Sequence, residues 1–219
     1  MAIIAPSLLA SNFLKLGDEC AMLDKSEADW FHLDIMDGRF VPNISFGPMI
    51  VEFVRKTTRK FCDVHLMIED PADFSEQFKK AGADQLTVHI EACPHLNRNL
   101  QQIRSLGMKA GIAVNPHTPI SLLADSLYLA DTICVMSVNP GFGGQKFIAQ
   151  TIERISQLRL LIDERETSTL IEVDGGIGPD NVGMVVQAGA DVIVAGSSVF
   201  GAASPEKVIS EMKKHQRPL

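Results

Sequence analysis

The chain has 219 residues, of which 46% are hydrophobic and 21% charged, so it is too apolar for a disordered protein and can bury one substantial core. It has 20 Lys and Arg residues and 27 Asp and Glu residues, which gives a net charge of −7. This charge argues against a nucleic-acid partner, because proteins that bind nucleic acid need a basic surface. These numbers predict a single globular domain over residues 1–219.

The cysteines and the N-terminal segment indicate the compartment. The four cysteines form no C-x-x-C pair, unlike a disulfide framework or a structural zinc site, so we expect reduced and packed thiols. No basic segment opens the chain, and no apolar run approaches the roughly 18 residues that a membrane span requires. We therefore expect a cytoplasmic protein without a membrane partner. The cysteines are Cys20, Cys62, Cys93 and Cys134.

Short apolar and β-branched segments alternate with amphipathic segments along the whole chain, with no linker between them. This alternation of strands and helices favours an α/β protein with a compact (β/α)8 TIM barrel. A doubly wound open sheet is the alternative, but no G-x-G-x-x-G motif follows the first strand. The predicted strands cover residues 3–5, 30–35, 61–67, 85–89, 109–114, 132–136, 169–173 and 192–195, and the predicted helices cover 13–25, 71–81, 96–106, 151–164, 181–188 and 205–214.

An Ala-Asp pair recurs at spacings of roughly a quarter of the chain and supports the same fold. Each pair closes a helix and opens the second, fourth, sixth or eighth strand. Two pairs lie in the string Ala-Gly-Ala-Asp, where Gly82 and Gly189 suit the left-handed position that ends a helix. The pairs are Ala28-Asp29, Ala83-Asp84, Ala130-Asp131 and Ala190-Asp191.

Polar residues late in the strands need a separate explanation, because the working groups of such a barrel lie at the carboxyl ends of its strands. In the second strand, period-two alternation places His32, Asp34 and Met36 on one face and apolar residues on the other. The apolar face should pack against helices, so His32 and Asp34 should point into the barrel. Asp37 and Gly38, which follow, indicate a turn or a cap.

The third and seventh strands bring further polar groups to the same end. His65 and Met67 share one face of the third strand, and Asp174 ends the seventh strand before two glycines. With His32 and Asp34 they make a set of two histidines and two carboxylates, which suits Zn²⁺, Fe²⁺, Mn²⁺ or Co²⁺. Taken alone, each histidine can also be a hydrogen-bonded core residue and each aspartate a cap at the end of a strand. A buried carboxylate is costly, however, unless it is paired or binds a metal.

Other titratable residues are expected to play lesser parts. Asp63 and Glu172 come too early in their strands to reach the mouth of the barrel, so we expect them inside the barrel or at its lower end. His89 in the fourth strand is expected to be a packed group or one that supports a ligand. Three further histidines are expected at the surface: His95, His117 and His215.

Three methionines occur late in the second, third and sixth strands: Met36, Met67 and Met136. One interpretation is that they fill gaps in a core, which is the commoner role of methionine. The other is that they form a dry wall that raises the basicity of the neighbouring carboxylates and shields a reactive intermediate from water.

Glycine-rich segments follow the last three strands. Segment 139–145, after the sixth strand, can bring backbone N–H groups against a phosphate or act as a mobile lid. Segments 174–178 and 195–198, after the seventh and eighth strands, stand where barrels often bind phosphate. Position and composition therefore both indicate a phosphate site.

These motifs, in this order, resemble the ribulose-phosphate 3-epimerase family over essentially the whole chain, with no departure at a functional position. The resemblance implies a barrel of the ribulose-phosphate-binding type and an isomerase of the non-oxidative pentose phosphate pathway. Such an enzyme interconverts D-ribulose 5-phosphate and D-xylulose 5-phosphate at C3 by two-base proton transfer through a cis-enediolate. The motifs lie at residues 5–13, 32–38, 40–43, 63–67, 136–145, 172–177 and 196–197.

The resemblance also implies roles for individual residues. Asp34 and Asp174 would be the two acid/base groups, with Asp34 removing the proton from ribulose 5-phosphate. One divalent metal ion, Zn²⁺ or Fe²⁺ foremost and Mn²⁺ or Co²⁺ otherwise, would be bound by His32, Asp34, His65 and Asp174. A homo-oligomer, either a dimer or a hexamer, is expected. The implied contacts to the sugar phosphate are Ser7, Met36, His65, Met67, Met136, Gly141, Phe142, Gly143, Gly144, Asp174, Gly175, Gly176, Gly196 and Ser197.

Three other functions remain to be weighed. An epimerase for allulose 6-phosphate shares the ligands and the reaction, but Gly144 and Gly176 resemble the pentose enzyme. A sugar-phosphate decarboxylase resembles D-x-K-x-x-D in its second strand, whereas here Met36 and Arg39 replace the lysine and the second aspartate, so the general acid is missing. A non-catalytic barrel that binds metal or sugar phosphate would gain nothing from two opposed carboxylates in an apolar pocket.

Overall fold

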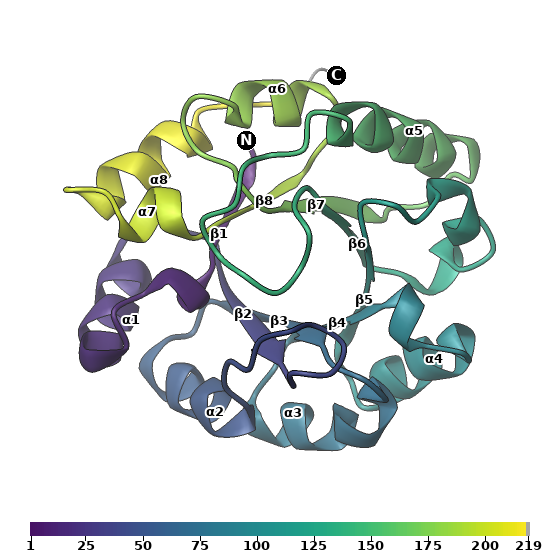
Figure 1. Cartoon of the computed structure of the whole chain (residues 1–219), viewed down its shortest axis with the longest axis horizontal. Coiled ribbons are helices and arrows are strands. Elements are labelled where there is room, and N and C mark those ends of the chain that lie inside the picture. The colour runs from purple at the N-terminus through teal and green to yellow at the C-terminus, as the bar shows by residue number, and fades with distance from the viewer. Residues whose placement is uncertain (218–219) are drawn as a thin grey trace.

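Eight parallel strands form a barrel in a computed structural model of the chain, which describes residues 1–217 (Figure 1). Neighbouring strands are hydrogen-bonded in the order β1-β8-β7-β6-β5-β4-β3-β2, and a parallel bridge between Ser7 and His32 connects β1 to β2. The predicted (β/α)8 barrel is confirmed, and the open doubly wound sheet is wrong; residues 218–219 of the predicted domain lie outside the described residues. The strands are β1 (Ile3–Pro6), β2 (Trp30–Met36), β3 (Phe61–Met67), β4 (Gln85–His89), β5 (Lys109–Val114), β6 (Thr132–Met136), β7 (Leu170–Asp174) and β8 (Val192–Ala195).

Helices surround the strands and cover the outer face of the barrel (Figure 1). Between β5 and β6 the chain forms two short 3₁₀ turns, η5 (Ile120–Leu123) and η6 (Leu127–Leu129). Among residues 1–217, no helix combines the length and the apolar character needed to cross a membrane. The helices are α1 (Leu16–Lys25), α2 (Pro48–Thr57), α3 (Ser75–Ala81), α4 (Leu96–Ser105), α5 (Thr151–Glu164), α6 (Val182–Gln187), α7 (Ser197–Phe200) and α8 (Pro205–Lys213).

The observed elements agree closely with the predicted ones. Every predicted strand is present, with bounds that differ by at most one residue. The predicted helices over 13–25 and 71–81 each begin with a 3₁₀ turn, η2 (Phe13–Lys15) and η3 (Pro71–Phe74). The helices α2 and α7 are absent from the prediction because α2 is rich in β-branched and aromatic residues, which lower helix propensity, and α7 is a single turn.

The main apolar core lies between the strands and the helices. On β2, Phe31 and Leu33 are fully buried and belong to the same cluster as Val51 and Val54 of α2. The predicted apolar outer face of this strand is therefore confirmed. Its other face points into the barrel, where His32 and Asp34 are also buried. Burial on both faces fixes the strand register, because a slip by one residue would exchange the two faces.

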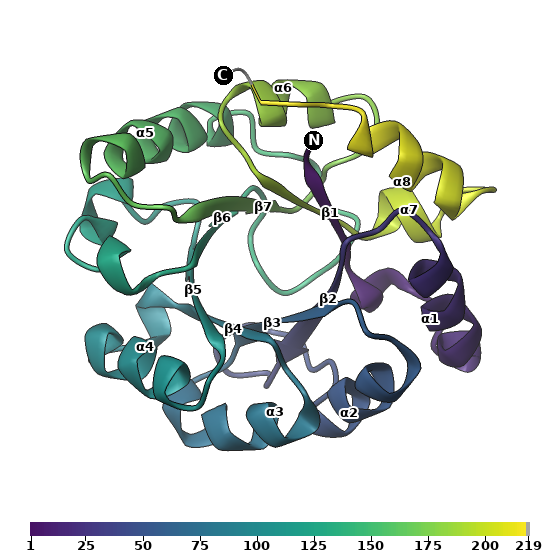
Figure 2. The ribbon, with the colours of Figure 1, turned by 180° about the vertical axis from the view of Figure 1, so that it is seen from behind.

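Each Ala-Asp pair ties two neighbouring strands together at the amino-terminal ends of the strands. Figure 2 shows the barrel from behind, the side opposite to the loop that follows β6. The aspartate precedes an even-numbered strand, and its carboxylate accepts a hydrogen bond of 2.8 to 3.0 Å from a backbone N–H of the strand before it. A Lys or Arg side chain also pairs with each carboxylate. The pairings are Asp29 with Ile4, Asp84 with Cys62, Asp131 with Ala110 and Asp191 with Ile171.

Candidate active site

Four polar side chains converge at the carboxyl ends of β2, β3 and β7. Oδ1 of Asp34 lies 3.2 Å from Nε2 of His32 and 3.1 Å from Nδ1 of His65. Oδ2 of Asp174 lies 3.7 Å from the same Nδ1 of His65. One ligand atom from each of the four residues falls within 4.8 Å of the other three. The structure therefore brings together the metal-ligand set that the sequence predicts.

The donor set fits a divalent metal ion. Both imidazoles are fully buried, and Asp34 is 3% exposed, so charged groups that would otherwise be costly to bury share one small space. Two nitrogen and two carboxylate donors suit Zn²⁺ or Fe²⁺ and do not select one of them. A second group of His32, Asp63 and Glu172 is also close enough for a metal, but it would use Nδ1 of His32, which is already hydrogen-bonded to Asp63.

Asp63 orients His32 by contacting the ring nitrogen that does not face Asp34. Its Oδ2 accepts a hydrogen bond of 2.6 Å from Nδ1 of His32, which leaves Nε2 facing Asp34. Its Oδ1 accepts a hydrogen bond from the side chain of Gln85, which in turn accepts one from Thr132. Carboxylates that hold metal-binding histidines in this way fix the ring orientation and the tautomer. The predicted interior position of Asp63 is confirmed.

Glu172 is the other carboxyl group inside the barrel, and it is also fully buried, as predicted. Burial, together with the nearby negative charge of Asp63, raises the pKa of Glu172 well above its usual range. Burial also opposes ionisation of Asp63, but the charge and the hydrogen bond of His32 outweigh it and lower the pKa of Asp63. Burial thus favours the neutral form of Glu172, which reduces the negative charge inside the barrel.

The two candidate acid/base groups have opposite electrostatic environments. Burial alone would raise the pKa of Asp34, but the charges and hydrogen bonds of His32 and His65 outweigh it and hold the pKa well below its usual range. Burial, with the nearby charge of Asp34, raises the pKa of Asp174 to about 6. Such a pair suits proton exchange, because one group is held as a base while the other readily takes up a proton.

His89 and Glu91 extend the site away from the metal ligands. Nε2 of His89 lies 2.9 Å from Nε2 of His65, and Nδ1 of His89 lies 3.2 Å from Oε2 of Glu91. Burial lowers the pKa of His89 to about 4. Burial opposes ionisation of Glu91, but hydrogen bonds from His89 and Thr118 lower its pKa to about 2. At neutral pH the pair is therefore a neutral imidazole beside a carboxylate.

A pocket opens above the ligands and is lined by groups from the ends of six strands and the loops after them. The three predicted methionines lie in its wall and are almost fully buried, which agrees with the dry-wall interpretation. No lysine or arginine contributes to this lining in the part of the chain described. Predicted contact residues found in the lining are Ser7, Met36, Met67, Met136, Gly141, Phe142, Gly143, Gly144, Asp174, Gly175, Gly176, Gly196 and Ser197.

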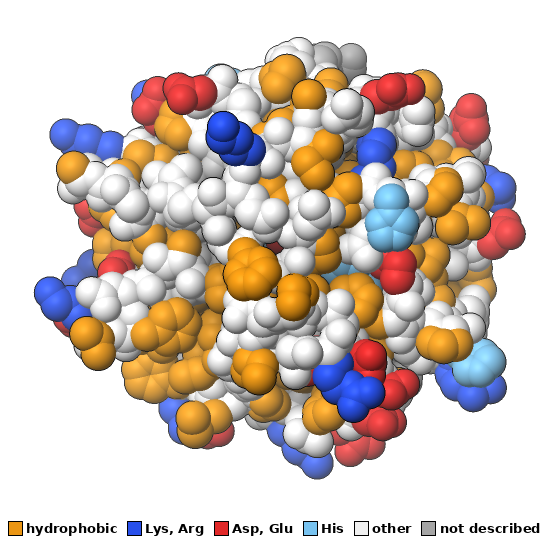
Figure 3. Space-filling model, viewed as in Figure 1, with side chains coloured by type: hydrophobic (Ala, Val, Ile, Leu, Met, Phe, Trp, Pro, Cys, Tyr) orange, Lys and Arg blue, Asp and Glu red, His pale blue; other side chains and the backbone are white. Residues whose placement is uncertain are grey.

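The segment after β6 arches across the mouth of the barrel (Figure 1). Gln145 braces it internally, donating hydrogen bonds to the carbonyl groups of Asn139 and Phe142. Asn43, from the loop after β2, donates a hydrogen bond of 2.7 Å to the carbonyl of Gly141. On this face, hydrophobic side chains and uncharged atoms occupy the centre, and Lys, Arg, Asp and Glu side chains lie mainly around the rim (Figure 3).

The sequence predicts only some of the residues around the site. The contact of His89 with His65 agrees with the prediction of a packed or supporting group. Glu91 was not predicted, because it lies in a 3₁₀ turn where the sequence resembles a solvated acid. Asp37 caps its loop by accepting from the N–H groups of Arg39 and Phe40, as predicted. His95 and His117 are exposed as predicted and His215 is half-buried.

Comparisons with known proteins agree with this geometry. The model of the "Ribulose-phosphate 3 epimerase family" matches residues 3–200. A ribulose-phosphate 3-epimerase of Synechocystis sp. is 50% identical over 218 residues, with 99% of this chain and 95% of the relative covered. A ribulose-phosphate 3-epimerase of Bacillus subtilis is 48% identical over 214 residues, with 97% of this chain and 99% of the relative covered.

Solved structures show the fold at much lower identity. KGPDC from Streptococcus mutans superposes with a TM-score of 0.73 at 14% identity, covering 98% of this chain and 96% of that one. Orotidine 5'-phosphate decarboxylase from Pyrococcus horikoshii superposes with a TM-score of 0.70 at 14% identity, covering 96% and 97%. These likenesses establish the barrel alone, whereas the family match and the near-full-length relatives establish that the chain belongs to the ribulose-phosphate 3-epimerase family.

Proposed function

We propose that this protein is a metal-dependent epimerase that interconverts D-ribulose 5-phosphate and D-xylulose 5-phosphate at C3. The observation that carries the proposal is the pair Asp34 and Asp174, which reach one methionine-walled pocket from β2 and β7 on opposite sides of the barrel (Figure 1). Inversion at C3 removes a carbon-bound proton from one face and returns a proton to the other, so it needs one such group on each face.

Asp34 is the base for ribulose 5-phosphate in this proposal. Its Oδ2 accepts a hydrogen bond of 2.5 Å from the hydroxyl of Ser7, so the carboxylate is held in one orientation at the pocket wall. Asp174 returns a proton to the opposite face of C3, and its raised pKa favours the protonated form that this step uses. In the reverse direction the two groups exchange roles.

The metal site supports the stability of the intermediate. His32, Asp34, His65 and Asp174 would hold the ion, and a bound divalent metal supplies Lewis-acid stabilisation of the enediolate oxygens, on the order of several kcal/mol. Either Zn²⁺ or Fe²⁺ suits this donor set. The methionine wall excludes water, so the charged groups interact strongly and the enediolate is protected from side reactions.

Substrate binding is assigned to the glycine-rich loops. We infer that backbone groups of Gly141–Gly144, Gly175 and Gly176, and of Gly196 and Ser197, hold the phosphate, because these residues line the pocket and no lysine or arginine side chain does so among the residues described. Backbone N–H groups in such loops favour an anion. Ser7 and His65 would contact the sugar, and the 141–144 segment would close over it.

We also infer a cytoplasmic homo-oligomer, a dimer or a hexamer, that acts as one barrel domain over residues 1–219. Large apolar side chains on the surface support association, since Leu14 is 96%, Met49 77% and Ile44 75% exposed.

A turnover assay with the metal-loaded protein tests the proposed function. D-ribulose 5-phosphate, D-allulose 6-phosphate and unphosphorylated D-ribulose would be compared under the same conditions. We expect the pentose phosphate to react with the highest kcat/KM, because the loops offer a phosphate site and Gly144 and Gly176 resemble the pentose enzyme. Absence of turnover of the pentose phosphate, with metal shown to be bound, would overturn the proposal.

A further inference from the structure

We propose that Glu91, acting through His89, holds His65 in the tautomer that presents a bare Nδ1 to the metal site. His89 and Glu91 are positioning residues in this account, and neither touches the reacting atoms. The inference rests on the metal site of the proposed function, and its consequences are the tautomers of two imidazoles and the Zn²⁺ affinity, neither of which depends on turnover. It can therefore be tested separately.

The side chains of His65, His89 and Glu91 form a continuous chain of contacts from the proposed metal site toward solvent. Nε2 of His65 on β3 lies 2.9 Å from Nε2 of His89 on β4, and Nδ1 of His89 lies 3.2 Å from Oε2 of Glu91 in η4 (Ile90–Ala92). Both histidine side chains are fully buried, and the Glu91 side chain is 20% exposed. Water is thus kept from the two imidazoles, and each ring nitrogen must find its partner within the protein.

The carboxylate at the outer end fixes the direction of every hydrogen bond. An ionised Glu91 can only accept, so Nδ1 of His89 carries the proton. When Nδ1 of His65 binds a metal ion, the proton of that ring lies on Nε2, which donates to Nε2 of His89. Nδ1 of His65 lies 3.1 Å from Oδ1 of Asp34 and 3.7 Å from Oδ2 of Asp174, so a bound metal ion would take the place of the proton that Nδ1 donates to Asp34.

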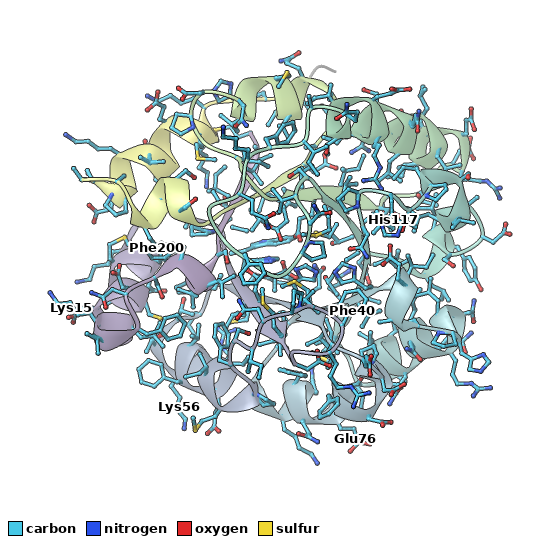
Figure 4. All side chains as sticks on the ribbon, viewed as in Figure 1. Lys15, Phe40, Lys56, Glu76, His117 and Phe200 are labelled. Carbon is cyan, nitrogen blue, oxygen red and sulfur yellow. The ribbon has the colours of Figure 1, made fainter. Side chains whose placement is uncertain are left out.

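Glu91 is itself held in place by the segment after β5. Its Oε1 accepts a hydrogen bond of 2.8 Å from the N–H of Asn115 and another from the hydroxyl of Thr118. Arg154 of α5 braces the same segment by donating to the carbonyls of Asn115 and Thr118 at 2.9 and 2.8 Å. The ring of Phe40, which Figure 4 labels, packs on His89 with centroids 4.7 Å apart. We call the chain of Glu91, His89 and His65 the relay. Several elements of the fold hold it in place, so it does not depend on one flexible side chain.

The two metal-site histidines are oriented by different means. His32 donates directly to a carboxylate, Asp63, and exposes Nε2, whereas His65 reaches a carboxylate only through a second imidazole and exposes Nδ1. The intervening ring places the charge of Glu91 farther from Asp34 and Asp174 than a direct partner would. Because repulsion between like charges falls with distance, this arrangement orients His65 without adding a near negative charge to the site.

The first test reads the tautomers of His65 and His89 in the Zn²⁺-loaded protein without any substitution. Long-range ¹H–¹⁵N spectra of the imidazole groups distinguish the Nε2–H from the Nδ1–H form. The relay predicts that His65 is in the Nε2–H form and His89 in the Nδ1–H form. A proton on Nε2 of His89 in the Zn²⁺-loaded protein would overturn the inference.

The second test removes the charge of Glu91. In Glu91→Gln the side-chain amide can face His89 with either its oxygen or its NH₂ group, so we expect a mixture of His89 tautomers and about a 10- to 100-fold weaker Zn²⁺ affinity in chelator competition. Glu211→Gln, which changes an exposed glutamate on α8, should leave the imidazole tautomers and the Zn²⁺ affinity unchanged. Glu91→Asp keeps the carboxylate and should restore the tautomer at least in part.

The outcomes separate the relay from the proposed function. An unchanged tautomer and an unchanged Zn²⁺ affinity in a folded Glu91→Gln variant would overturn the relay while leaving the epimerase proposal intact. If Glu91→Gln does not fold, Thr118→Val removes one of the bonds that hold Glu91 and should weaken Zn²⁺ binding to a smaller extent. Failure of the unsubstituted protein to bind Zn²⁺ would refute the metal site, whereas bound Zn²⁺ with His89 in the Nε2–H form would refute the relay alone.

Discussion

Asp34 and Asp174 meet different partners although both face the same pocket. Both oxygens of Asp34 are engaged, Oδ1 by His32 and His65 and Oδ2 by the hydroxyl of Ser7. Asp174 is held instead through its backbone carbonyl, which accepts from the N–H and the hydroxyl of Ser137, both at 2.8 Å, and its side chain is 15% exposed. The fixed base and the more accessible acid are consistent with the two roles assigned to them.

Replacing Asp174 with asparagine should stop epimerisation but not the first proton removal. We predict that Asp174→Asn lowers turnover by roughly 10²- to 10⁴-fold, the usual effect of losing a general acid/base group, while Asp34 still exchanges the C3 proton of ribulose 5-phosphate with solvent. Both rates can be followed by proton NMR at measured metal occupancy. Asp180→Asn, at an exposed site in the same loop region, is the control, and near-native turnover of Asp174→Asn would contradict the two-base scheme.

Among the loops, Gly176 determines how two of the glycine-rich segments fit together. Its φ is +66°, in the left-handed region, and an added Cβ would lie 2.5 Å from the backbone N of Phe147 and 2.8 Å from the carbonyl O of Gln145. A side chain here would therefore meet rigid backbone and an unfavourable φ. The close approach of the two loops depends on this glycine.

We predict that Gly176→Ala displaces the segment that arches over the pocket and raises KM for the sugar phosphate by about tenfold or more, since a shift of a binding group of about 1 Å is costly. Steady-state kinetics measure the effect, and the thermal midpoint shows whether the barrel remains folded. Gly17→Ala in α1, where the nearest atom to the new Cβ is a Phe53 ring carbon at 3.8 Å, should leave KM unchanged. An unchanged KM in Gly176→Ala would refute the proposed packing.

The repeated Ala-Asp pairs make a prediction about stability at the other end of the barrel. Asp191 accepts from the backbone N–H of Ile171 at 2.9 Å and pairs with Arg159 and Arg217. We predict that Asp191→Ala lowers the free energy of unfolding by about 1 to 3 kcal/mol, because it leaves a buried N–H and a mostly buried arginine without this acceptor. Urea titration measures the change. The exposed Asp163→Ala should change it by less than about 0.5 kcal/mol, and an equal effect at both positions would argue against the role of the repeat.

The strands and the ligand set could be predicted from sequence because their signals are local. Runs of buried β-branched residues mark the strands, and the alternation in β2 places His32 and Asp34 on the inner face. Contacts such as that between Glu91 and Thr118 could not be predicted, because they depend on how β4 and β5 are aligned and on the course of the loop after β5. A carboxylate one turn beyond a strand has no local feature that separates it from a solvated surface acid.

For the whole molecule, the proposed metal site connects strands that are distant in the sequence. Its ligands come from β2, β3 and β7, so a bound ion would tie the two sides of the barrel together at its open end. Because the ligand atoms converge only in the folded chain, binding should favour the folded state.

Removing the metal should therefore lower the stability of the whole barrel. A metal at 100 times its dissociation constant is expected to add about 2.7 kcal/mol to the free energy of unfolding, so a chelator should lower the thermal midpoint by several degrees. Differential scanning calorimetry with and without Zn²⁺ measures this. His65→Asn, which lacks one ligand, should show a much smaller shift, and an unchanged midpoint in the unsubstituted protein would contradict the metal site.

If this barrel inverts C3 of a ketose phosphate by exchanging its proton with solvent, a proton NMR time course of D-ribulose 5-phosphate in D₂O with the metal-loaded protein reads the exchange directly. We predict loss of the C3–H signal and formation of D-xylulose 5-phosphate with deuterium at C3. Formation of xylulose 5-phosphate that retains the original C3 proton, or no reaction with metal bound, would contradict the two-base epimerase.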